Sequence, residues 1–226
     1  MMPLEAHGLH RFYRRGGGNE VAALLDVSLT CAAGETVAVT GPSGSGKSTL
    51  LGLLAGLDDP DGGAVHVAGH RLSHQNPAVS ARLRARHIGV LTQSSGLLGH
   101  LSVLENVRFA ASLRAGSGPD PEELLDALGL SAVQRATTRT LSGGETARAG
   151  LAVALAGAPA VLLADEPTAE VSSTEEDTIL DLLRQWLPAA GATVIVTHSA
   201  TVAAYADRVV HLTDGRIDQS LQGRAA

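Results

Sequence analysis

The sequence predicts an α/β fold with an inserted α-helical subdomain, and three observations lead to this prediction. Four short runs rich in β-branched and apolar residues, at 36–40, 88–92, 161–164 and 192–196, are typical of buried strands. Helical patterns occur between them, as expected for an α/β core. The middle of the chain, from about 92 to 139, shows no strand pattern. We therefore expect this middle part to be a helical subdomain inserted into the core.

Local signals place the other elements. Two helix starts carry capping boxes, Ser102 with Glu105 and Ser172 with Glu175. The pair Asp214 and Gly215 predicts a hairpin with a two-residue turn. Residues 14–19 are expected to form a turn, and 71–77 and 94–100 to form loops. The expected strands are 4–13, 27–31, 36–40, 64–67, 88–92, 161–164, 192–196 and the hairpin 208–218; the expected helices are 49–55, 80–86, 103–113, 121–128, 146–156, 172–187 and 200–206.

Residues 41–49, GPSGSGKST, fit the pattern G-x-x-x-x-G-K-[ST] of a phosphate-binding loop. They follow a predicted strand and open a predicted helix, which is the context that the motif requires. The glycines let backbone N–H groups surround phosphate oxygens, and the positive end of the helix dipole faces the same oxygens. The expected nucleotide contacts in this loop are Gly41, Pro42, Ser43, Gly44, Ser45, Gly46, Lys47, Ser48 and Thr49.

Lys47 is the only lysine in the chain, where all other basic side chains except histidine are arginines. Its compact ammonium can reach the β- and γ-phosphates, and the hydroxyl of Ser48 can bind Mg²⁺. The alternative is a Gly/Ser turn that matches the motif by chance. The predicted strand before it and the predicted helix after it argue against this alternative.

Polar residues follow three of the predicted strands. Asp165 and Glu166 end the strand 161–164, and two adjacent acids there cost free energy unless they have a function. Neighbouring strand residues point to opposite faces, so their roles differ: Asp165 would hold Mg²⁺ through its water shell, and Glu166 would orient or deprotonate the attacking water. Gln93 and His198 end two further strands and would converge on the same crevice. Solvated strand-end acids, and a structural histidine, are the alternatives.

Two other features have both a functional and a structural interpretation. Tyr13 can stack on an adenine ring, or it is a strand residue with a solvated hydroxyl. The turn LSGGE at 141–145 precedes a helix, and a Gly-rich helix N-terminus can bind an anion. Taken alone, a simple N-cap is the favoured interpretation of this turn.

Composition excludes several other classes of protein. The chain has 226 residues, 44% hydrophobic and 18% charged, with a net charge of −6 that argues against a duplex-binding surface. The single cysteine, Cys31, cannot form an internal disulfide. The N-terminus has no signal-peptide pattern, and the apolar stretch 149–164 is shorter than a membrane span of about 20 residues. We expect a chain that reaches a membrane only through a partner.

In chain order these motifs resemble those of the nucleotide-binding subunits of ATP-binding cassette (ABC) transporters, and the resemblance covers essentially the whole chain. Residues 41–49 match Walker A, VLLADEP at 161–167 matches Walker B, and Tyr13 matches the adenine-stacking aromatic. Gln93 corresponds to the Q-loop glutamine and His198 to the switch histidine. LSGGE matches the signature that separates this family from other P-loop ATPases. That LSGGE form, with RHIGV at 86–90 and LSVLENV at 101–107, resembles the lipoprotein-release and macrolide-export type.

The resemblance implies one ABC ATPase domain over 1–226. It has a P-loop NTPase core with a mixed sheet, an N-terminal antiparallel β-subdomain and an inserted α-helical subdomain. Residues 1–92 and 158–226 would form the core with the β-subdomain, and 93–157 would form the helical, signature-bearing part.

The resemblance also implies a mechanism, with ATP and Mg²⁺ as cofactors. Two copies would form a head-to-tail homodimer with two ATP molecules between them, and hydrolysis would drive a separate membrane permease. The chain would be cytoplasmic and peripheral on the inner face of the membrane, without a nucleic-acid partner. The implied catalytic residues are Glu166, His198 and Gln93; the metal-binding residues are Ser48, Gln93 and Asp165; the signature residues acting on the partner's ATP are Leu141, Ser142, Gly143, Gly144 and Glu145.

Two departures from the family pattern bear on activity. The loop after Walker B, the D-loop, usually ends in aspartate, but here Ser172 ends the run 169–172 (AEVS). After the signature, TAR at 146–148 replaces the usual Gln-Gln-Arg. We expect ATP hydrolysis with slow turnover. The alternative function is a soluble ABC ATPase of repair, translation or cell division, although the chain has neither the long insertions nor the second cassette of such proteins.

Overall fold

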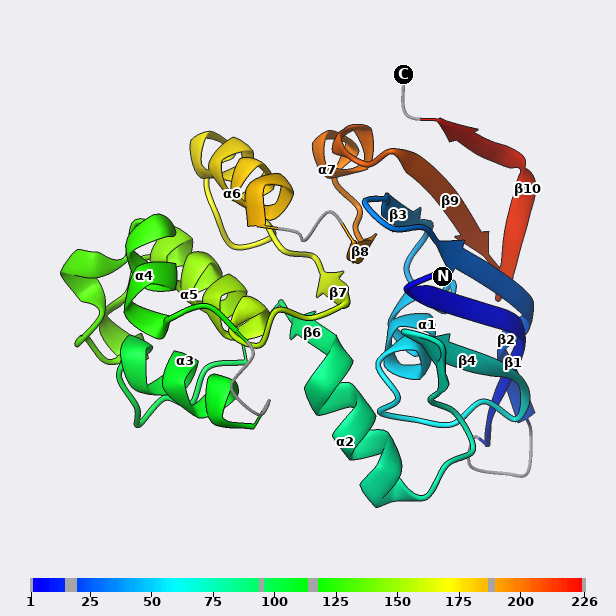
Figure 1. Cartoon of the computed structure of the whole chain (residues 1–226). Helices are drawn as coiled ribbons and strands as arrows, with labels where there is room; N and C mark the ends of the chain where they lie inside the picture. Colours follow the sequence, from blue (N-terminus) through cyan, green and yellow to red (C-terminus); the bar gives the residue numbers. More distant parts are fainter. Residues whose placement is uncertain (1, 15–19, 94–95, 114–117, 187–189, 225–226) are drawn as a thin grey trace.

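The structure is a computed structural model that describes residues 2–14, 20–93, 96–113, 118–186 and 190–224. It consists of two sheets and a group of helices (Figure 1). The smaller sheet is antiparallel, in the order β2-β1-β4-β5. Its strands are β1 Leu4–Arg14, β2 Glu20–Cys31, β4 Gly62–Val67 and β5 His70–Arg71. This confirms the N-terminal antiparallel part of the predicted fold.

The larger sheet is mixed and has the order β10-β9-β3-β8-β7-β6. All its neighbouring strands run parallel except β10, which pairs antiparallel with β9. Parallel strands place their carboxyl ends at one edge, which is where α/β folds bind ligands. The strands are β3 Thr36–Thr40, β6 Ile88–Leu91, β7 Val161–Asp165, β8 Ala192–Val196, β9 Arg208–Thr213 and β10 Arg216–Arg224.

The connection between the neighbouring strands β6 and β7 contains three of the helices, grouped at the left of Figure 1. These are α3 Val103–Ser112, α4 Pro121–Ala127 and α5 Gly143–Leu155. The insertion of helices into the α/β core is therefore confirmed. The other helices are α1 Lys47–Leu54, α2 Pro77–His87, α6 Ser173–Trp186 and α7 Ala200–Tyr205, and short 3₁₀ turns lie at Ser131–Val133 and Thr138–Thr140.

Two hydrophobic clusters stabilise these parts. One joins β1, β2 and β4 to α1 and β3, with Leu50 and Val39 fully buried within it. The other joins α3, α4 and α5 to α6 and to β6, β7 and β8, with Leu151 and Leu162 at its centre. The cores consist mainly of Leu, Val and Ala, as the 2% aromatic content requires. Among the described helices, none is long and apolar enough to cross a membrane.

Several predicted bounds were wrong. The second strand begins at Glu20 rather than at 27, because its irregular first half pairs with β1 through several register shifts. A short strand, His70–Arg71, overlaps the first residue of the predicted loop 71–77, and α2 begins at Pro77, capped by Asn76, rather than at 80. The helix predicted to begin at 146 begins at Gly143. Residues 15–19 and 94–95 of the predicted turn and loop lie outside the described residues.

Two other local predictions were correct. Ser102 caps α3 in a capping box with Glu105. Asp214 and Gly215 have φ angles of 48° and 74°, the positive values that a tight hairpin between β9 and β10 requires. The capping box predicted at Ser172 was wrong: the Ser172 hydroxyl contacts the Glu175 carboxylate at 3.3 Å, and the Glu175 N–H donates to the backbone oxygen of Ser172 rather than to its side chain.

An ion pair between Glu35 and Arg208 contributes to the stability of the fold, and its pH dependence can be measured. The Glu35 carboxylate accepts hydrogen bonds from Arg208 Nε and from the Ala32 N–H, both at 2.7 Å. Burial raises the pKa of Glu35, but these bonds outweigh burial and the net pKa lies below its usual value. Because the folded-state pKa is lowered, this stabilisation is present above the unfolded pKa and is lost as pH falls through the folded one.

We expect Glu35→Gln to lower the free energy of unfolding at pH 7 by about 2 kcal/mol and Tm by about 5 °C. The difference from the parent should shrink below about pH 4.5, the usual pKa of this carboxyl. Glu20→Gln is the matched control, because Glu20 pairs with an exposed Arg14 and surface pairs contribute about 0–1 kcal/mol. Thermal unfolding measured from pH 3.5 to 7.5 checks this, and equal Tm values for Glu35→Gln and parent at pH 7 would refute it.

Candidate active site

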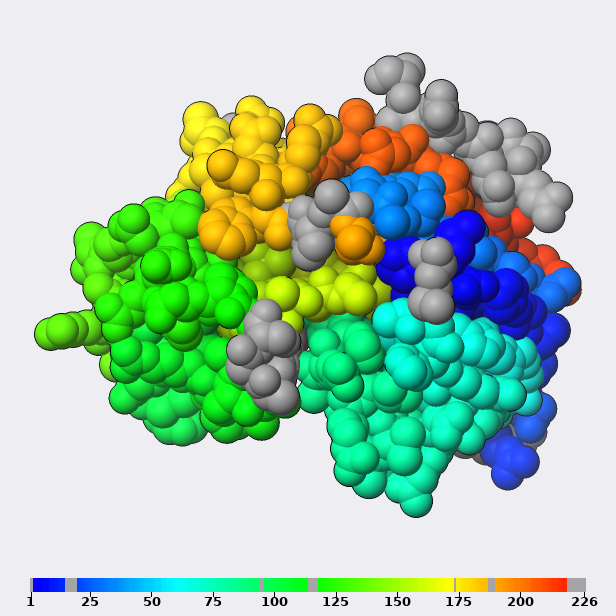
Figure 2. Space-filling view, in the orientation of Figure 1, coloured from blue at the N-terminus to red at the C-terminus, as the bar shows by residue number. Residues whose placement is uncertain are grey.

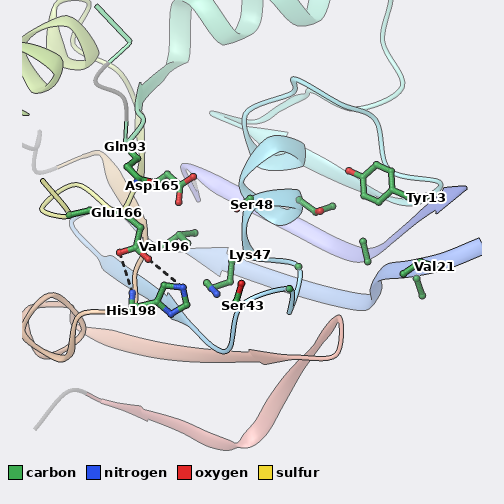
Figure 3. Close-up of a pocket in the computed structure, with 16 residues that line it drawn as sticks. Tyr13, Val21, Ser43, Lys47, Ser48, Gln93, Asp165, Glu166, Val196 and His198 are labelled. Atoms are coloured by element: carbon green, nitrogen blue, oxygen red, sulfur yellow. Dashed lines mark hydrogen bonds and ion pairs between the residues drawn. The ribbon is translucent and has the colours of Figure 1, made fainter. Parts of the chain in front are cut away.

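A pocket of about 640 Å³ lies at the carboxyl edge of the large sheet, beside the phosphate loop. Figure 3 shows the side chains that line it. The structure brings together residues from β1, the phosphate loop and α1, and the ends of β6, β7 and β8. Of the residues predicted from sequence, those lining the pocket are Tyr13, Ser43, Gly44, Gly46, Lys47, Ser48, Thr49, Gln93, Asp165, Glu166 and His198. This volume is in the range of small-molecule sites.

The conformation of the phosphate loop requires glycine at two positions. A Cβ on Gly41 would lie 2.0 Å from the backbone oxygen of Leu212, and one on Gly46 would lie 2.4 Å from that of Ala23. Gly44 has a φ of 80° and no atom within 4 Å of a built Cβ, so its side faces open space. The loop is thus closely packed against neighbouring strands and open toward the pocket.

Lys47 is held inside this loop. Its ammonium donates to the carbonyl oxygens of Gly41 and Pro42 at 2.8 and 2.9 Å, and the residue is only 7% exposed. Burial lowers the pKa of Lys47, and the carboxylates of Glu166 and Asp165 raise it, with a net lowering. An ammonium has three N–H groups, so one remains to donate to a phosphate.

The loop fits an anion on the side that faces the pocket. The side of Gly44 is open, and two N–H groups of Lys47 are used by loop carbonyls, which leaves the third for a phosphate oxygen. The buried hydroxyl of Ser45 lies beside Gly41 and Leu212, outside the set of described residues that line the pocket, and is not part of this fit.

The two acids at the end of β7 have different surroundings. Burial and then Glu166 raise the pKa of Asp165, while Lys47 and His198 lower it, and the net pKa lies above the usual value. Glu166 accepts hydrogen bonds at one oxygen, Oε2, from the Thr197 hydroxyl at 3.0 Å and the His198 N–H at 3.2 Å. Its other oxygen, Oε1, lies 3.7 Å from His198 Nε2 and has no hydrogen bond. The dashed lines of Figure 3 mark these His198 contacts.

The backbone of Glu166 is also unusual. Its φ of 46° is in the left-handed region, which non-glycine residues rarely adopt. The Glu166 N–H donates to the Val196 oxygen at 2.9 Å, so the end of β8 holds it in this conformation. Backbone strain of this kind is concentrated at functional sites.

The oxygen ligands expected for Mg²⁺ come from Ser48, Gln93 and Asp165, which line the same pocket. A hydroxyl, an amide and a carboxylate are the hard oxygen donors that Mg²⁺ prefers, together with nucleotide phosphates. The donor set therefore fits Mg²⁺.

The signature segment lies outside the nucleotide pocket, although Gly143 lines a small neighbouring hollow with Gln93 and Glu166. Ser142 caps α5, and Glu145 completes a capping box by accepting from the Ser142 N–H at 2.8 Å. The simple N-cap is therefore present, and it explains a glutamate at the end of LSGGE. Leu141, Ser142, Gly143, Gly144 and Glu145 are outside the set of described residues that line the pocket. This part of the chain does not contribute to the nucleotide pocket of its own subunit.

Several residues that line the pocket were not predicted from the sequence. Val21, Ala22 and Ala23 line it because β2 begins earlier than predicted. Ala169 and Val196 also line it. These small apolar residues carry no chemical signal, and only the position of their strands and loops identifies them.

This fold and this pocket define the chain as a P-loop nucleotide-binding protein. The profile of the family described as "ABC transporter" matches residues 24–169, more than half of the chain. The chain therefore belongs to the ABC transporter family, and it is an ATPase of that family.

The relatives agree with this assignment. The ABC transporter ATP-binding protein YbbA of Escherichia coli is 41% identical over 221 residues, which cover 96% of each chain. The macrolide export ATP-binding/permease protein MacB of Rhodopirellula baltica is 39% identical over 231 residues, which cover 99% of this chain. The chain spans only 34% of the length of that MacB.

Solved structures of similar proteins confirm the fold. The dimeric post-hydrolysis structure of the ATP-binding cassette MJ0796, bound to ADP and Pi, matches with a TM-score of 0.89 and 29% identity, covering 99% of each chain. The cassette cbiO1 of Clostridium perfringens, part of the complex cbiONQ, matches with a TM-score of 0.82 and 28% identity over 99% of this chain and 89% of that one.

Proposed function

We propose that the chain is the ATP-binding subunit of an ABC exporter or mechanotransmission complex, which hydrolyses ATP as a head-to-tail homodimer to drive a separate permease. The observation that carries this proposal is the single pocket that combines a phosphate loop, two strand-end acids and His198, while the signature lies outside it. Residues 1–92 and 158–226 would form the core, and 93–157 the signature subdomain.

In this proposal the pocket binds ATP along its length. Tyr13 stacks on the adenine ring, and the phosphate loop, with Lys47, holds the phosphates. Ser48, Gln93 and Asp165 hold Mg²⁺ at the phosphates. When bound, Mg²⁺ neutralises charge that develops on the transferred phosphoryl group. The raised pKa of Asp165 is consistent with a site that favours added positive charge.

Hydrolysis requires a base beside the γ-phosphate. We propose that Glu166 accepts a proton from water through Oε1, the oxygen that has no hydrogen bond and that is buried near the His198 ring, so it must open to the water for this step. The water oxygen bonds to the γ-phosphorus as the bond to the β-γ bridging oxygen breaks, which gives ADP and Pi. Thr197 and the His198 N–H fix Oε2, so the carboxylate is already oriented. The His198 ring would contact the γ-phosphate.

The signature explains the need for a second copy. Ser142 accepts the capping bond from the Glu145 N–H, which leaves its hydroxyl hydrogen free to donate to an anion. A partner's pocket would bring ATP to this helix N-terminus, where the helix dipole favours a phosphate. The dimeric cassette structures among the relatives support this arrangement.

A groove of about 430 Å³ supports the expected contact with a permease. It is lined by residues of α2, β6, α3 and α5. In Figure 2 the green part, which contains α3, lies beside the teal part, which contains α2. Phe109 and Leu113 at its rim are 50% and 59% exposed, which is unusual for large apolar residues. We propose that a short helix of the permease docks there and places the chain on the cytoplasmic face of the membrane.

The altered D-loop yields a prediction about turnover. The hydroxyl of Ser172 donates to Glu175 Oε2 at 3.3 Å, and Glu175 Oε1 lies 3.8 Å from Arg148. An aspartate at 172 alone would place a second carboxylate beside Glu175. We expect Ser172→Asp combined with Glu175→Gln to raise the ATPase kcat by about fivefold, because coupling between the two sites improves.

The control for this prediction is Glu175→Gln alone. Steady-state ATPase rates of the purified chain with its permease provide the measurement. Unchanged or slower turnover in the double variant, with parental Tm, would show that Ser172 does not limit the cycle.

The transporter function is tested by capturing the tagged chain from detergent-solubilised membranes and identifying its partners by mass spectrometry. We expect a polytopic membrane protein in near-equal amount, and Phe109→Asp should abolish its recovery. Arg139→Asp, outside the groove, is the control. Recovery of the parent chain without a membrane protein would favour the soluble, non-transport ATPase instead.

A further inference from the structure

Arg11 lies against the ring of Tyr13. Its guanidinium carbon is 4.9 Å from the ring centroid, a cation–π distance. Two acids hold the guanidinium in place: one terminal nitrogen lies 2.7 Å from Asp58 Oδ2 and the other 3.3 Å from Asp61 Oδ1. The Arg11 side chain is only 20% exposed, so this cluster is partly removed from solvent.

The same acids also hold the strand that carries the aromatic ring. Asp61 Oδ2 accepts from the Phe12 N–H at 2.7 Å, and the Asp61 N–H donates to the His10 oxygen at 2.8 Å. The Tyr13 hydroxyl reaches Asp58 at 3.5 Å. Both acids lie in the segment that follows α1, the helix that begins in the phosphate loop. The cluster therefore fixes the ring relative to the phosphate loop.

Tyr13 lines the pocket, whereas Arg11 is outside the set of described residues that line it. Arg11 therefore contacts the ring without being part of the pocket lining itself. Tyr13 itself is 42% exposed, so without this support its ring has room to change rotamer.

We propose that Arg11 is a positioning residue for the nucleobase: held by Asp58 and Asp61, it fixes the Tyr13 ring as a stacking surface at a set distance from the phosphate loop. This inference rests on the proposed ATP binding at this pocket. A ring that is already ordered before binding avoids the entropy cost of immobilising it, which raises affinity for a ligand with a base. A ligand without a base gains nothing from the ring.

The test compares ATP with inorganic tripolyphosphate, which has no base, by calorimetry with Mg²⁺. We expect Arg11→Ala to raise the Kd of ATP about fivefold and to leave the Kd of tripolyphosphate unchanged. Asp58→Asn removes the shorter ion pair but keeps Arg11. It should raise the Kd of ATP by less than Arg11→Ala does and leave the Kd of tripolyphosphate unchanged. Arg14→Ala is the matched control, because Arg14 is an 86% exposed arginine of the same strand end, and should change neither Kd.

The outcomes separate the possible explanations. An equal rise in the Kd of ATP and of tripolyphosphate in Arg11→Ala would show a general charge effect and overturn the positioning role. An unchanged Kd for ATP in both Arg11→Ala and Asp58→Asn would also overturn it. If the parent binds tripolyphosphate but has the same affinity for ATP, the base is not bound and this inference fails alone. If the parent binds neither, the proposed function fails as well.

Discussion

Replacing Glu166 by glutamine should lower the rate of ATP hydrolysis by about 10²–10⁴-fold and leave ATP binding near the parental level. The amide has nearly the same shape as the carboxylate and can still accept from Thr197 and the His198 N–H at one oxygen. It cannot accept a proton from water. The loss is therefore specific to the chemical step.

Single-turnover and steady-state ATPase assays, with the Kd of ATP measured in parallel, check this prediction. Glu123→Gln is the control, since this exposed acid of α4 is absent from the nucleotide pocket. Hydrolysis by Glu166→Gln at the parental rate would mean that another group activates the water.

Replacing Lys47 by alanine should weaken ATP binding by about 10–100-fold, because hydrogen bonds to a charged group contribute about 1.5–3 kcal/mol. Lys47→Arg should not restore affinity, since the planar guanidinium is larger than the ammonium that fits between the Gly41 and Pro42 carbonyls. Calorimetric titration of both variants with ATP supplies the measurement.

A second measurement uses the chemistry of the parent chain. Lys47 is its only lysine, so an amine-acylating reagent has one side-chain target besides the terminal amine. ATP should protect Lys47 from acylation, as read by mass spectrometry. Equal labelling with and without saturating ATP, or an unchanged Kd in Lys47→Ala, would exclude Lys47 from phosphate binding.

The parts of the fold predicted from sequence were those with strong local signals. The buried strands around Val39, Leu163 and Ile195 have continuous apolar runs, and parallel pairing then places their polar ends at one edge. The bounds of β2 could not be predicted, because its first half lacks a regular alternation and pairs with β1 through register shifts, such as the one between Arg11 and Phe12. The start of α5 was misplaced because glycines resemble a turn, although the capping box at Ser142 sets it.

For the site, the sequence predicted the motif residues but not the contacts that orient them. Motif spacing identified the residues that the structure gathers around the pocket, such as Lys47 and Glu166. The contacts that orient them are long-range and have no sequence signal: Thr197 holds Glu166 across 31 positions, and Asp58 meets Arg11 across 47. The roles of individual residues stay predictions until the variants are measured.

The proposed dimer is tested most directly by the mass of purified Glu166→Gln in solution, measured by light scattering with and without Mg²⁺ and ATP. Because the signature residues Ser142 and Gly144 lie outside the pocket of their own chain, we predict a monomer without nucleotide and a dimer with ATP. Adding Ser142→Arg to this variant should keep it monomeric while it still binds ATP. A Glu166→Gln chain that is saturated with ATP and remains a monomer would contradict the head-to-tail dimer and with it the proposed mechanism.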